Sequence, residues 1–574
     1  MTGALLQLVA IGNQDIFITG NPQISFFKCV YKRYSNFAMQ SKSLNFDSTQ
    51  YLNYENPTKL NINVPIYGEL LSKMNFEFML PEIYSDIKYE FKWIHSIGSA
   101  IITYAKLFIN DVMVEHIEGD YINVYYNSTL TDEQLKVYND MIGNIPELYD
   151  AYRNIENKYN IGVRGSSLPS ISGRKITVPL PFWFSKSDGQ EIPIVALSNS
   201  KIRVEIELKS IKSLYTLIDS YSGIRGKQIA LNDSYQDSTT SLNTGNTVSH
   251  ARRKRPENPN EEIRNFMEST IENRWELKPR LDVEYIYLDA AEQKLMKNMD
   301  HRYLIERVQN NEFIGLIGKK VIELKVFNPT KELYIVPTRD DISERNQFTN
   351  YTNLDYIGQE QNIYDYQNYL YGLCRAKYSF DNTNPISVLG MFRTDSGMTE
   401  DVYIREGDID NVLDKDYYLN KSEAFTNEDI QKFIDNWNYR REEDIPYINK
   451  DNYRYYKSDI INSLEIKFNG DIRLAERTND YFSKIMPYIH HTNKQPNGAY
   501  IYSFSINPEK YQPSGACNFS NIKDVMLEIN FKEPENYEVS KMKNIKYNLR
   551  IYTTSYNLLK IDNDTCQLLS LIHI

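Results

Sequence analysis

Apolar and polar residues alternate with a period of two over many short stretches of this chain. Over residues 202–208 (IRVEIEL), aliphatic residues alternate with charged ones, which is the pattern of a strand with one buried face. Asn110-Asp111, between two apolar residues, predicts a two-residue hairpin turn. The same alternation predicts strands over residues 60–66, 281–287, 322–326, 464–468, 525–531 and 545–551. The pattern therefore predicts a mainly β protein.

Helical patterns are few. Thr131 and Gln134 form a capping box that predicts a short helix after Thr131. A second helix is expected over residues 290–299, where the strand alternation breaks near mid-chain. Thr426 caps a third segment, whose apolar stripe consists of Ile430, Phe433, Ile434 and Trp437.

Two long stretches, residues 210–275 and 341–458, lack sustained alternation and carry polar or charged clusters. Such stretches cannot supply the inner face of a sheet, so we expect both to be insertions between strands.

A similar spacing of motifs occurs twice in the remaining chain, as a weak sign of an internal repeat. Phe184-Ser185 precedes an alternating strand that begins 20 residues later, and Phe504-Ser505 precedes one that begins 21 residues later. Two similar β halves, joined near residues 289–300, would produce this spacing.

The amino-acid composition of the chain limits the classes of molecule that it is expected to bind. The chain has 574 residues, with 65 Lys and Arg against 76 Asp and Glu, so its formal net charge is −11. This acidity argues against broad contact with nucleic-acid phosphates. Aromatic residues make up 13% of the chain, chiefly 46 Tyr and 24 Phe, types that suit strands and surfaces with one dry and one wet side.

The cysteines and the N-terminal segment indicate a reducing compartment. Cys29, Cys374, Cys517 and Cys566 lie far apart and form no CxxC pair, so we expect reduced, buried thiols rather than a disulfide framework or a zinc site. Residues 4–11 are apolar, but no basic residue precedes them, which makes them a poor signal peptide. No window of about 18 consecutive apolar residues, the length that spans a membrane, occurs in the chain.

The chain matches the motifs of phosphate loops and metal sites only weakly. Residues 315–319 (GLIGK) have two residues between the glycines instead of four, and Lys320 stands where Ser or Thr would bind magnesium, so we expect a turn between strands. His490-His491 are adjacent, so on a strand they would face opposite sides and could not chelate one metal together. No GxSxG or HExxH pattern is present.

Two charged segments can each be interpreted either as a solvated loop or as a binding site. Asp408 and Asp410 begin like a calcium loop, but Val412 and Leu413 stand where a ligand and the required glycine belong. A solvated acidic loop is expected there, with weak calcium binding as the alternative. Residues 252–255 (RRKR) could address the nucleus or contact nucleic acid, but their polar, Pro-containing surroundings favour a solvated loop tip. We therefore assign no catalytic, cofactor-binding or metal-ligating residue and expect no enzyme activity and no cofactor.

A series of motifs resembles one protein family. Residues 12–28 (GNQDIFITGNPQISFFK), continued by residues 31–38 (YKRYSNFA), resemble the opening of the major capsid proteins of nucleocytoplasmic large DNA viruses. Further similar motifs follow in the family's order at residues 180–184 (LPFWF), 192–193, 196–197, 285–289 (YIYLD), 303–306 (YLIE), 327–333 (FNPTKEL), 481–482, 487–488, 511–515 (YQPSG) and 518–520 (NFS). The resemblance covers nearly the whole chain except the two expected insertions.

The resemblance implies an all-β fold of two consecutive eight-stranded jelly rolls, a double jelly roll with long loop insertions and few short helices. We then expect an N-terminal arm over residues 1–25, a first roll over residues 26–289 with the insertion at about 210–275, and a second roll over residues 290–574 with the insertion at about 341–458.

The resemblance also implies a function. Three subunits would form a pseudo-hexagonal homotrimer, and these capsomers would tile an icosahedral shell around an inner membrane and a DNA genome. The expected partners are neighbouring capsomers, minor capsid proteins beneath the shell and, through the N-terminal arm, the inner membrane, with no direct nucleic-acid contact. The protein would be found in the virion after assembly in the host cytoplasm.

Two alternatives remain at this stage. A non-virion scaffold protein can have the same double roll. A glycan-binding or glycan-cleaving jelly roll is the third hypothesis, because fold alone does not decide function. Hydrolysis would need a carboxylate pair at a defined separation, and the sequence locates none.

Overall fold

The computed structural model describes the two β-rich parts of the chain. Its described residues are 19, 21–23, 25, 27, 31–47, 51–83, 89–149, 171–219, 228–229, 276–343, 346–353, 459–532, 545–562 and 565–569.

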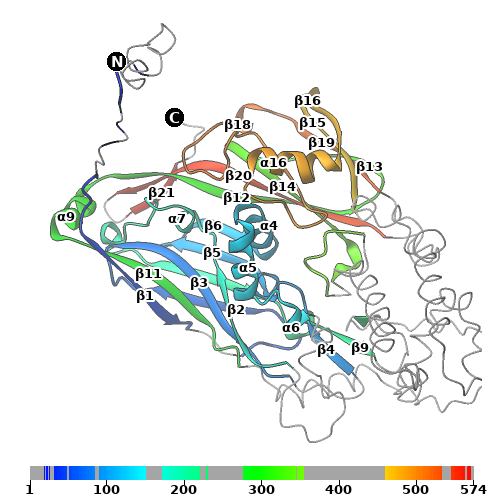
Figure 1. The fold of residues 1–574 in the computed structure, drawn as a ribbon, viewed down its shortest axis with the longest axis horizontal. Helices are drawn as coiled ribbons and strands as arrows, with labels where there is room; N and C mark the ends of the chain where they lie inside the picture. The colour runs from blue at the N-terminus through cyan, green and yellow to red at the C-terminus, as the bar shows by residue number, and fades with distance from the viewer. Residues whose placement is uncertain are drawn as a thin grey trace, which may run out of the picture.

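Two antiparallel four-stranded sheets form the first roll (Figure 1). One sheet has the strand order β1–β11–β3–β7 and the other the order β2–β8–β5–β6, which is the jelly-roll arrangement. The bounds of the first sheet are β1 (Phe37–Asn45), β11 (Arg280–Leu288), β3 (Leu70–Leu80) and β7 (Arg174–Pro179). Those of the second sheet are β2 (Thr58–Val64), β8 (Ile202–Leu208), β5 (Ile102–Ile109) and β6 (Val112–Glu118).

The second roll repeats this arrangement with its own two sheets. One has the order β12–β20–β14–β17, with β18 added to β14 and β21 to β20, and the other has the order β13–β19–β15–β16. The first sheet contains β12 (His301–Leu316), β20 (Tyr547–Asp562), β14 (Pro329–Arg339), β17 (Tyr500–Ser503), β18 (Cys517–Asn518) and β21 (Thr565–Leu569). The second contains β13 (Lys319–Glu323), β19 (Val525–Phe531), β15 (Ile461–Phe468) and β16 (Asp471–Thr478). The double jelly roll expected from the sequence is therefore confirmed.

The predicted strands appear with shifted ends. The strand expected over residues 60–66 ends at Val64, because Pro65 has no N–H to continue the ladder, and Ile66 is exposed. The strand expected over residues 322–326 begins and ends earlier, as β13, although Leu324 continues the extended chain and donates to the Val525 carbonyl at 2.8 Å. Asn110, with φ 54°, and Asp111 form the predicted turn between β5 and β6.

A third, small sheet lies beside the rolls. It has the order β10–β9–β4, from β10 (Gln228–Ile229), β9 (Tyr215–Asp219) and β4 (Tyr89–Trp93). The start of the first expected insertion is thus regular structure: the short helix η3 (Ile211–Ser213) leads into β9, which pairs with β4. Residues 230–275 and 354–458, including the segment capped by Thr426, lie outside the described residues.

The predicted helices at Thr131 and near residue 290 are confirmed. Helix α5 (Asp132–Met141) has Thr131 as its N-cap, with the reciprocal capping box to Gln134. Helix α9 (Ala290–Asn298) connects the rolls, begins at the N-cap Asp289 and buries none of its residues. Sequence patterns did not predict α3 (Ile97–Ile101), α4 (Gly119–Thr129), α6 (Pro146–Tyr149), α7 (Trp183–Lys186), η2 (Ile194–Leu197), η4 (Asp340–Ile342), η5 (Tyr481–Ile485), α16 (Met486–His490) and η6 (Phe519–Asn521).

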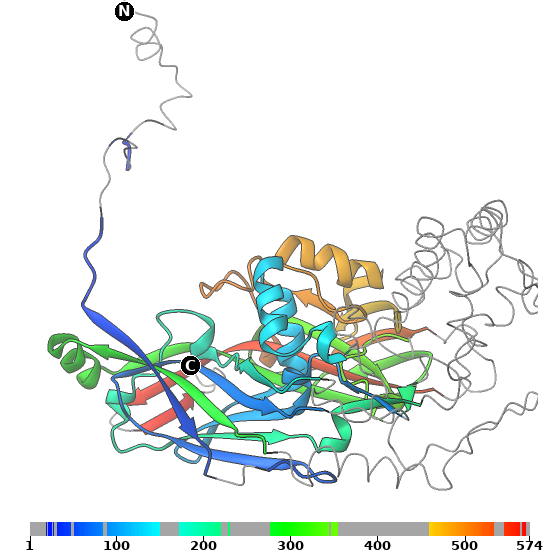
Figure 2. The same ribbon diagram turned by 60° about the horizontal axis from the view of Figure 1, so that its bottom comes forward.

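Residues 31–36 leave the body of the first roll before β1 begins (Figure 2). All six are exposed and have no regular secondary structure, and Tyr34 makes an edge contact with Phe37 at a ring-centroid distance of 6.5 Å. This segment therefore adds little to the core of its own chain.

Candidate functional site at the junction of the two rolls

Helix α4 is one of the elements of the first roll that pack against the second roll. It follows strand β6 without a loop, and a Cβ at its first residue, Gly119, would overlap the carbonyl oxygens of Ser99 and Ile102. Only glycine allows this close approach, which sets the direction in which the helix leaves the sheet. Tyr121, at one turn from the start, then points to the second roll.

An aromatic cluster forms the centre of the junction. The Tyr121 ring lies 5.8 Å from that of Tyr334 on β14 and 5.7 Å from that of Tyr552 on β20, measured between centroids. All three side chains are buried, and burial raises the pKa of each hydroxyl well above its usual value, so the hydroxyls remain neutral hydrogen-bonding groups. Such a pair of rings contributes about 0.5–1.5 kcal/mol beyond the burial of its area.

Charged and polar groups surround this cluster. Asp120 of α4 forms an ion pair with Arg550 of β20 at 2.5 Å. Glu118, the last residue of β6, accepts hydrogen bonds from the Tyr552 hydroxyl at 2.7 Å and the Asn310 amide at 2.9 Å. These contacts tie strands β12 and β20 to the end of β6.

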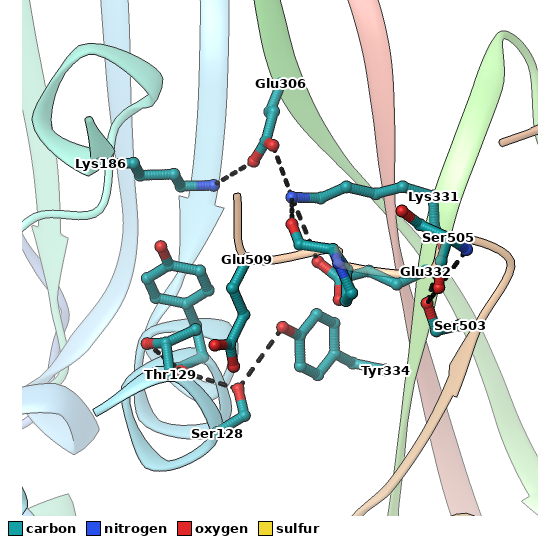
Figure 3. Close-up of polar contacts among 12 residues, drawn as sticks. Ser128, Thr129, Lys186, Glu306, Lys331, Glu332, Tyr334, Ser503, Ser505 and Glu509 are labelled. Atoms are coloured by element: carbon teal, nitrogen blue, oxygen red, sulfur yellow. Dashed lines mark hydrogen bonds and ion pairs between the residues drawn. The ribbon is translucent and has the colours of Figure 1, made fainter. Parts of the chain in front are cut away.

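A buried chain of charges lies on the other side of the cluster (Figure 3). Lys186 of α7 contacts Glu306 of β12 at 3.5 Å, and Glu306 contacts Lys331 of β14 at 2.5 Å. Lys331 also donates to the Pro508 carbonyl at 2.7 Å and lies 3.6 Å from Glu332. The chain thus crosses from the first roll to the second and then across the sheet of the second roll.

The ionised form of this network is favoured despite its burial. For both lysines burial opposes the charge, but Glu306 and its neighbouring carboxylates raise the pKa of Lys186 and Lys331 above the usual value. Burial likewise opposes the charge of Glu306, yet Lys331 and Lys186 hold its pKa below the usual range. Each charge is therefore stable only while its partners are present, and the loss of one partner is costly.

One acid at the edge of the network has the opposite behaviour. Glu115 of β6 is buried, and burial raises its pKa to about 7 in spite of the nearby Lys186. Its Oε2 atom accepts a hydrogen bond from the Trp183 amide at 2.9 Å, while its Oε1 atom has no hydrogen-bond partner among the described residues. A carboxyl in this position favours its protonated form in the folded state.

His490 and His491 lie at the end of a helix, where His491 is the C-cap of α16. His490 ends α16 and its Nδ1 atom lies 2.9 Å from the Ile506 carbonyl. His491 extends toward the junction, with its Nδ1 atom 3.3 Å from Glu509 and its Nε2 atom 3.7 Å from Glu332. Aromatic strand-formers around Pro487 obscured the helix in the sequence.

The other sequence candidates lie apart from this junction. Gly318, with positive φ, lies in the turn between β12 and β13, as expected for residues 315–319, and Gly315, also with positive φ, lies at the irregularity near the end of β12. Asp408, Asp410 and residues 252–255 lie outside the described residues, as do Cys29 and Cys374. Cys566 is a buried free thiol as expected, whereas Cys517 is only half-buried.

The described residues contain neither a metal site nor a membrane-spanning helix. They contain no group of three or more His, Cys, Asp or Glu side chains that could hold a metal ion. Within the same part of the chain, every helix is too short or too polar to cross a membrane.

Sequence reasoning missed the junction itself. Lys331-Glu332 stands directly before the apolar run 333–336 (LYIV), and an adjacent pair of charges inside a buried strand is a signal of a partnered ionic site. In α4, Tyr121, Val124 and Ser128 follow helical spacing, but the Tyr, Ile and Val content of the segment favours a strand.

Two family models match most of the chain. The model described as "Major capsid protein N-terminus" matches residues 25–243, and the one described as "Large eukaryotic DNA virus major capsid protein" matches residues 292–566. The matches divide between the two rolls.

Relatives of similar length support these matches. The major capsid protein of Phaeocystis pouchetii virus is 27% identical over 575 residues and is covered, like this chain, to 98%. Among solved structures, a chain of the PBCV-1 virus capsid has a TM-score of 0.56 at 19% identity, with 95% of this chain and 99% of that one covered. The Faustovirus major capsid protein also has a TM-score of 0.56, at 11% identity, with 97% and 96% covered. The structural likenesses show the same fold.

Proposed function

The chain belongs to the major capsid proteins of large eukaryotic DNA viruses, and from this premise we propose that three copies form a homotrimeric capsomer with six rolls in a pseudo-hexagonal ring. As a structural subunit of the virion capsid it assembles with other capsid subunits. In the proposal, the capsomers tile an icosahedral shell.

The observation that carries the trimer is the unequal covering of the two rolls. In the second roll, ten of the eleven residues of β14 are buried. Helix α4 of the first roll packs on this sheet at Tyr334 and Tyr552, and Glu118 of β6 contacts Asn310 and Tyr552. In the first roll, the corresponding strand β3 alternates between buried and exposed positions, and β1 is mostly exposed. The outer face of the sheet β1–β11–β3–β7 corresponds to the face of the second roll that is covered at the junction. It is thus left open in a single chain.

The oligomeric state of the purified protein tests this proposal. Light scattering coupled to size exclusion should give three times the 67.4 kDa subunit mass, about 202 kDa. A stable monomer at micromolar concentration would contradict the trimer. A trimer that is absent from purified virus particles would instead favour a non-virion scaffold.

The division of the chain outside the rolls is part of the proposal. Residues 1–25 would form an arm beneath the capsomer that contacts minor capsid proteins and the inner membrane. Its support is that residues 31–36, which lead to the arm, are exposed and leave the body of the first roll (Figure 2). Deletion of residues 1–20 should preserve the trimer and impair particle assembly; loss of the trimer would contradict this role.

The insertions would decorate the outer surface of the shell. The first roll would comprise residues 26–289 and the second residues 290–574, with loops at about 210–275 and 341–458 facing outward. Lengthening a loop costs little entropy, so such insertions leave the rolls intact. Limited trypsin digestion of the trimer should cut first at residues 252–255, and first cuts inside β8 or β19 would contradict the placement.

The function requires neither catalysis nor contact with the genome. The net charge of −11 favours a shell protein that stays away from nucleic acid. We place its assembly in the host cytoplasm, where free thiols such as that of Cys566 remain reduced.

A further inference from the structure

After helix α16 the chain of the second roll contacts the first roll through residues 491–493, here named the strap. The backbone N–H of Asn493 donates to the Ser128 carbonyl of α4 at 2.9 Å. Its side-chain amide donates to the Leu130 carbonyl at 3.2 Å and to Asp132 of α5 at 2.9 Å. Carbonyls at the end of a helix lack partners inside the helix, and here the strap supplies them. The strap therefore ties the end of α4 to the second roll.

The ring of His491, the first residue of the strap, lies between two carboxylates from different segments. The side chain is fully buried. Its Nδ1 atom lies 3.3 Å from Oε1 of Glu509, in the loop after β17, and its Nε2 atom lies 3.7 Å from Oε2 of Glu332 on β14. Figure 3 shows these two acids on their separate segments. Among the described residues, neither Nε2 of His491 nor Oε2 of Glu332 has a hydrogen-bond partner. One proton on Nε2 would provide both atoms with one.

Only the doubly protonated ring can serve both carboxylates. A neutral imidazole has a single N–H, so a bond from Nδ1 to Glu509 leaves Nε2 as an acceptor that faces the Glu332 carboxylate. Two acceptors that face each other in a buried site are unfavourable. The imidazolium has two N–H groups, and both bonds are then charge-assisted.

The buried charges around His491 are one cation short. The acids are Glu306, Glu332 and Glu509, and the cations are Lys186 and Lys331. Burial opposes the charge of Glu509, yet hydrogen bonds from His491 and Thr492 hold its pKa below the usual range. Glu115 and Arg307, at the other end of the network, are one acid and one base and leave the difference unchanged. A charge on His491 would balance the network.

The remaining charged groups near the strap lie at the surface. Asp132 is exposed and accepts from Asn493, and Lys494 and Lys510, next to the strap and next to Glu509, are exposed as well. Water and salt screen such groups, so they do not replace a cation inside the junction. The neighbouring His490 has its Nδ1 atom 2.9 Å from the Ile506 carbonyl rather than from an acid.

We propose that His491 is a proton-operated clamp between the two rolls: its protonated ring joins Glu509 to Glu332 and holds the strap, and loss of the proton to water releases the strap. Histidine is the side chain that ordinarily changes its charge between pH 5 and pH 8. Because the charge on the ring forms the bridge, the strap is held on the acidic side of this change and is released as pH rises. All the groups belong to one chain, so the clamp does not depend on the proposed trimer.

Hydrogen–deuterium exchange of the full-length protein, measured by mass spectrometry, tests the clamp. The backbone N–H groups of the strap donate to the Pro487 carbonyl, to Glu509 and to the Ser128 carbonyl, so their exchange reports release of the strap. After correction for the base-catalysed rate, protection of the strap should fall at least about tenfold from pH 6 to pH 8.5, since bonds to charged groups are lost. This fall should exceed that of a peptide from β8, which reports global unfolding and includes the effect of Glu115.

Two neighbouring histidines provide a variant and its matched control. His491→Gln cannot take up the proton, so its strap should have the same low protection at both pH values. His490→Gln removes the adjacent ring, which lies at a carbonyl, and should keep the pH dependence of the wild type.

A third variant keeps His491 and removes one of its two anions. Glu332→Gln is nearly isosteric, but the charged ring then loses a carboxylate that favours it. The pH at which half of the strap protection is lost should therefore be lower than in the wild type. A merely structural role of the ring would leave this pH unchanged.

Each result supports or overturns the clamp. A strap whose corrected protection changes with pH no more than that of β8 would overturn it in the wild type alone. A His491→Gln protein that keeps the pH dependence, or a His490→Gln protein that loses it, would place the proton on another group. An unchanged midpoint in Glu332→Gln would overturn the bridge to β14, and this variant and the wild type decide the matter even when His491→Gln does not fold.

Discussion

The sheet β1–β11–β3–β7 of the first roll and the sheet β12–β20–β14–β17 of the second have equivalent strand orders, but among the residues that the structure describes only the second is covered on both faces. Strands β3 and β14 each have 11 residues and lie third in that order. β3 alternates between buried and exposed positions, as a strand with one dry face should, whereas β14 is buried almost throughout. The neighbouring roll contributes to this difference, because α4 packs against β14 and β20 and the end of β6 contacts β12 and β20.

Covering the second face changes which residues the strand can carry. The Lys73 side chain on β3 is exposed and needs no partner. Lys331 on β14 is buried and is held by Glu306 and by the Pro508 carbonyl. A charge on the covered face is thus an obligatory part of a network, while a charge on the uncovered face of β3 is solvated by water.

Replacement of the buried Lys331 should have the largest effect on the free energy of unfolding. Lys331→Met leaves Glu306 with only Lys186 as a close cationic partner in a buried site, which should lower the free energy of unfolding by about 3–5 kcal/mol. Urea denaturation at fixed protein concentration measures this change in the free energy of unfolding.

Lys73→Met is the matched control and should change the free energy of unfolding by no more than about 0.5 kcal/mol. Lys331→Met/Glu306→Leu should recover part of the loss, since no unpaired carboxylate then remains. Equal effects of Lys331→Met and Lys73→Met would show that covering the second face adds no energetic demand.

Glu115→Gln should change how the free energy of unfolding depends on pH. Glu115 has a pKa near 7 in the folded state and a usual value of 4.5, so the folded state holds its proton more tightly. The stability from that proton is fully present below pH 4.5 and is lost as pH rises through 7. By linkage the loss is up to about 3 kcal/mol at pH 8.

The neutral amide removes this dependence. We therefore expect Glu115→Gln to unfold at higher urea concentration than the wild type at pH 8 and to show a smaller difference at pH 5. Asp459, whose pKa burial raises to about 6, stays in both proteins and contributes equally to both profiles. A constant difference between the two proteins from pH 5 to pH 8 would contradict the assignment.

The ion pair at the rim of the junction should have a smaller effect. Asp120 and Arg550 lie 2.5 Å apart, but the Arg550 side chain is 38% exposed, so water screens the pair. A double-mutant cycle with Asp120→Asn and Arg550→Gln should give a coupling of about 1 kcal/mol in the free energy of unfolding, reduced by salt. The absence of coupling would mean that this ion pair adds nothing to the other contacts that join the rolls.

Met39→Ser should have the smallest effect on the fold. Its side chain is half exposed on the outer side of the sheet β1–β11–β3–β7, so the free energy of unfolding of the subunit should change by less than about 0.5 kcal/mol. The trimer fraction after dilution should fall, since this side of the sheet is the surface that the proposed trimer covers. A large loss of subunit stability would show that this side of the sheet already belongs to the core of the single chain.

Period-two patterning predicted much of the β structure, and it did so because it acts locally. The strand over residues 525–531 matches β19, and that over residues 202–208 matches β8, since both bury one face within their own roll. The capping box at Thr131 predicted α5 for the same reason, as its donor and acceptor lie three residues apart.

Elements at the junction escaped such reasoning because their environment comes from distant residues. The segment of α4 has the Tyr, Ile and Val content of a strand, and its packing against Tyr334 and Tyr552 outweighs that preference. Strand β14 alternates in the ladder like any strand, but a buried second face erases the polar positions by which alternation is recognised.

Local patterns of the amino-acid sequence were sufficient to predict the class of fold, most of the strands and the family, because alternation and motifs extend over only a few residues. Only the tertiary structure decided which of two equivalent sheets is covered and which stays open. That choice depends on contacts such as those of Asp120 with Arg550 and Lys186 with Glu306, whose partners are hundreds of residues apart or on different rolls. Local patterns contain no information on such pairs, because the burial of a face depends on what the rest of the chain places against it.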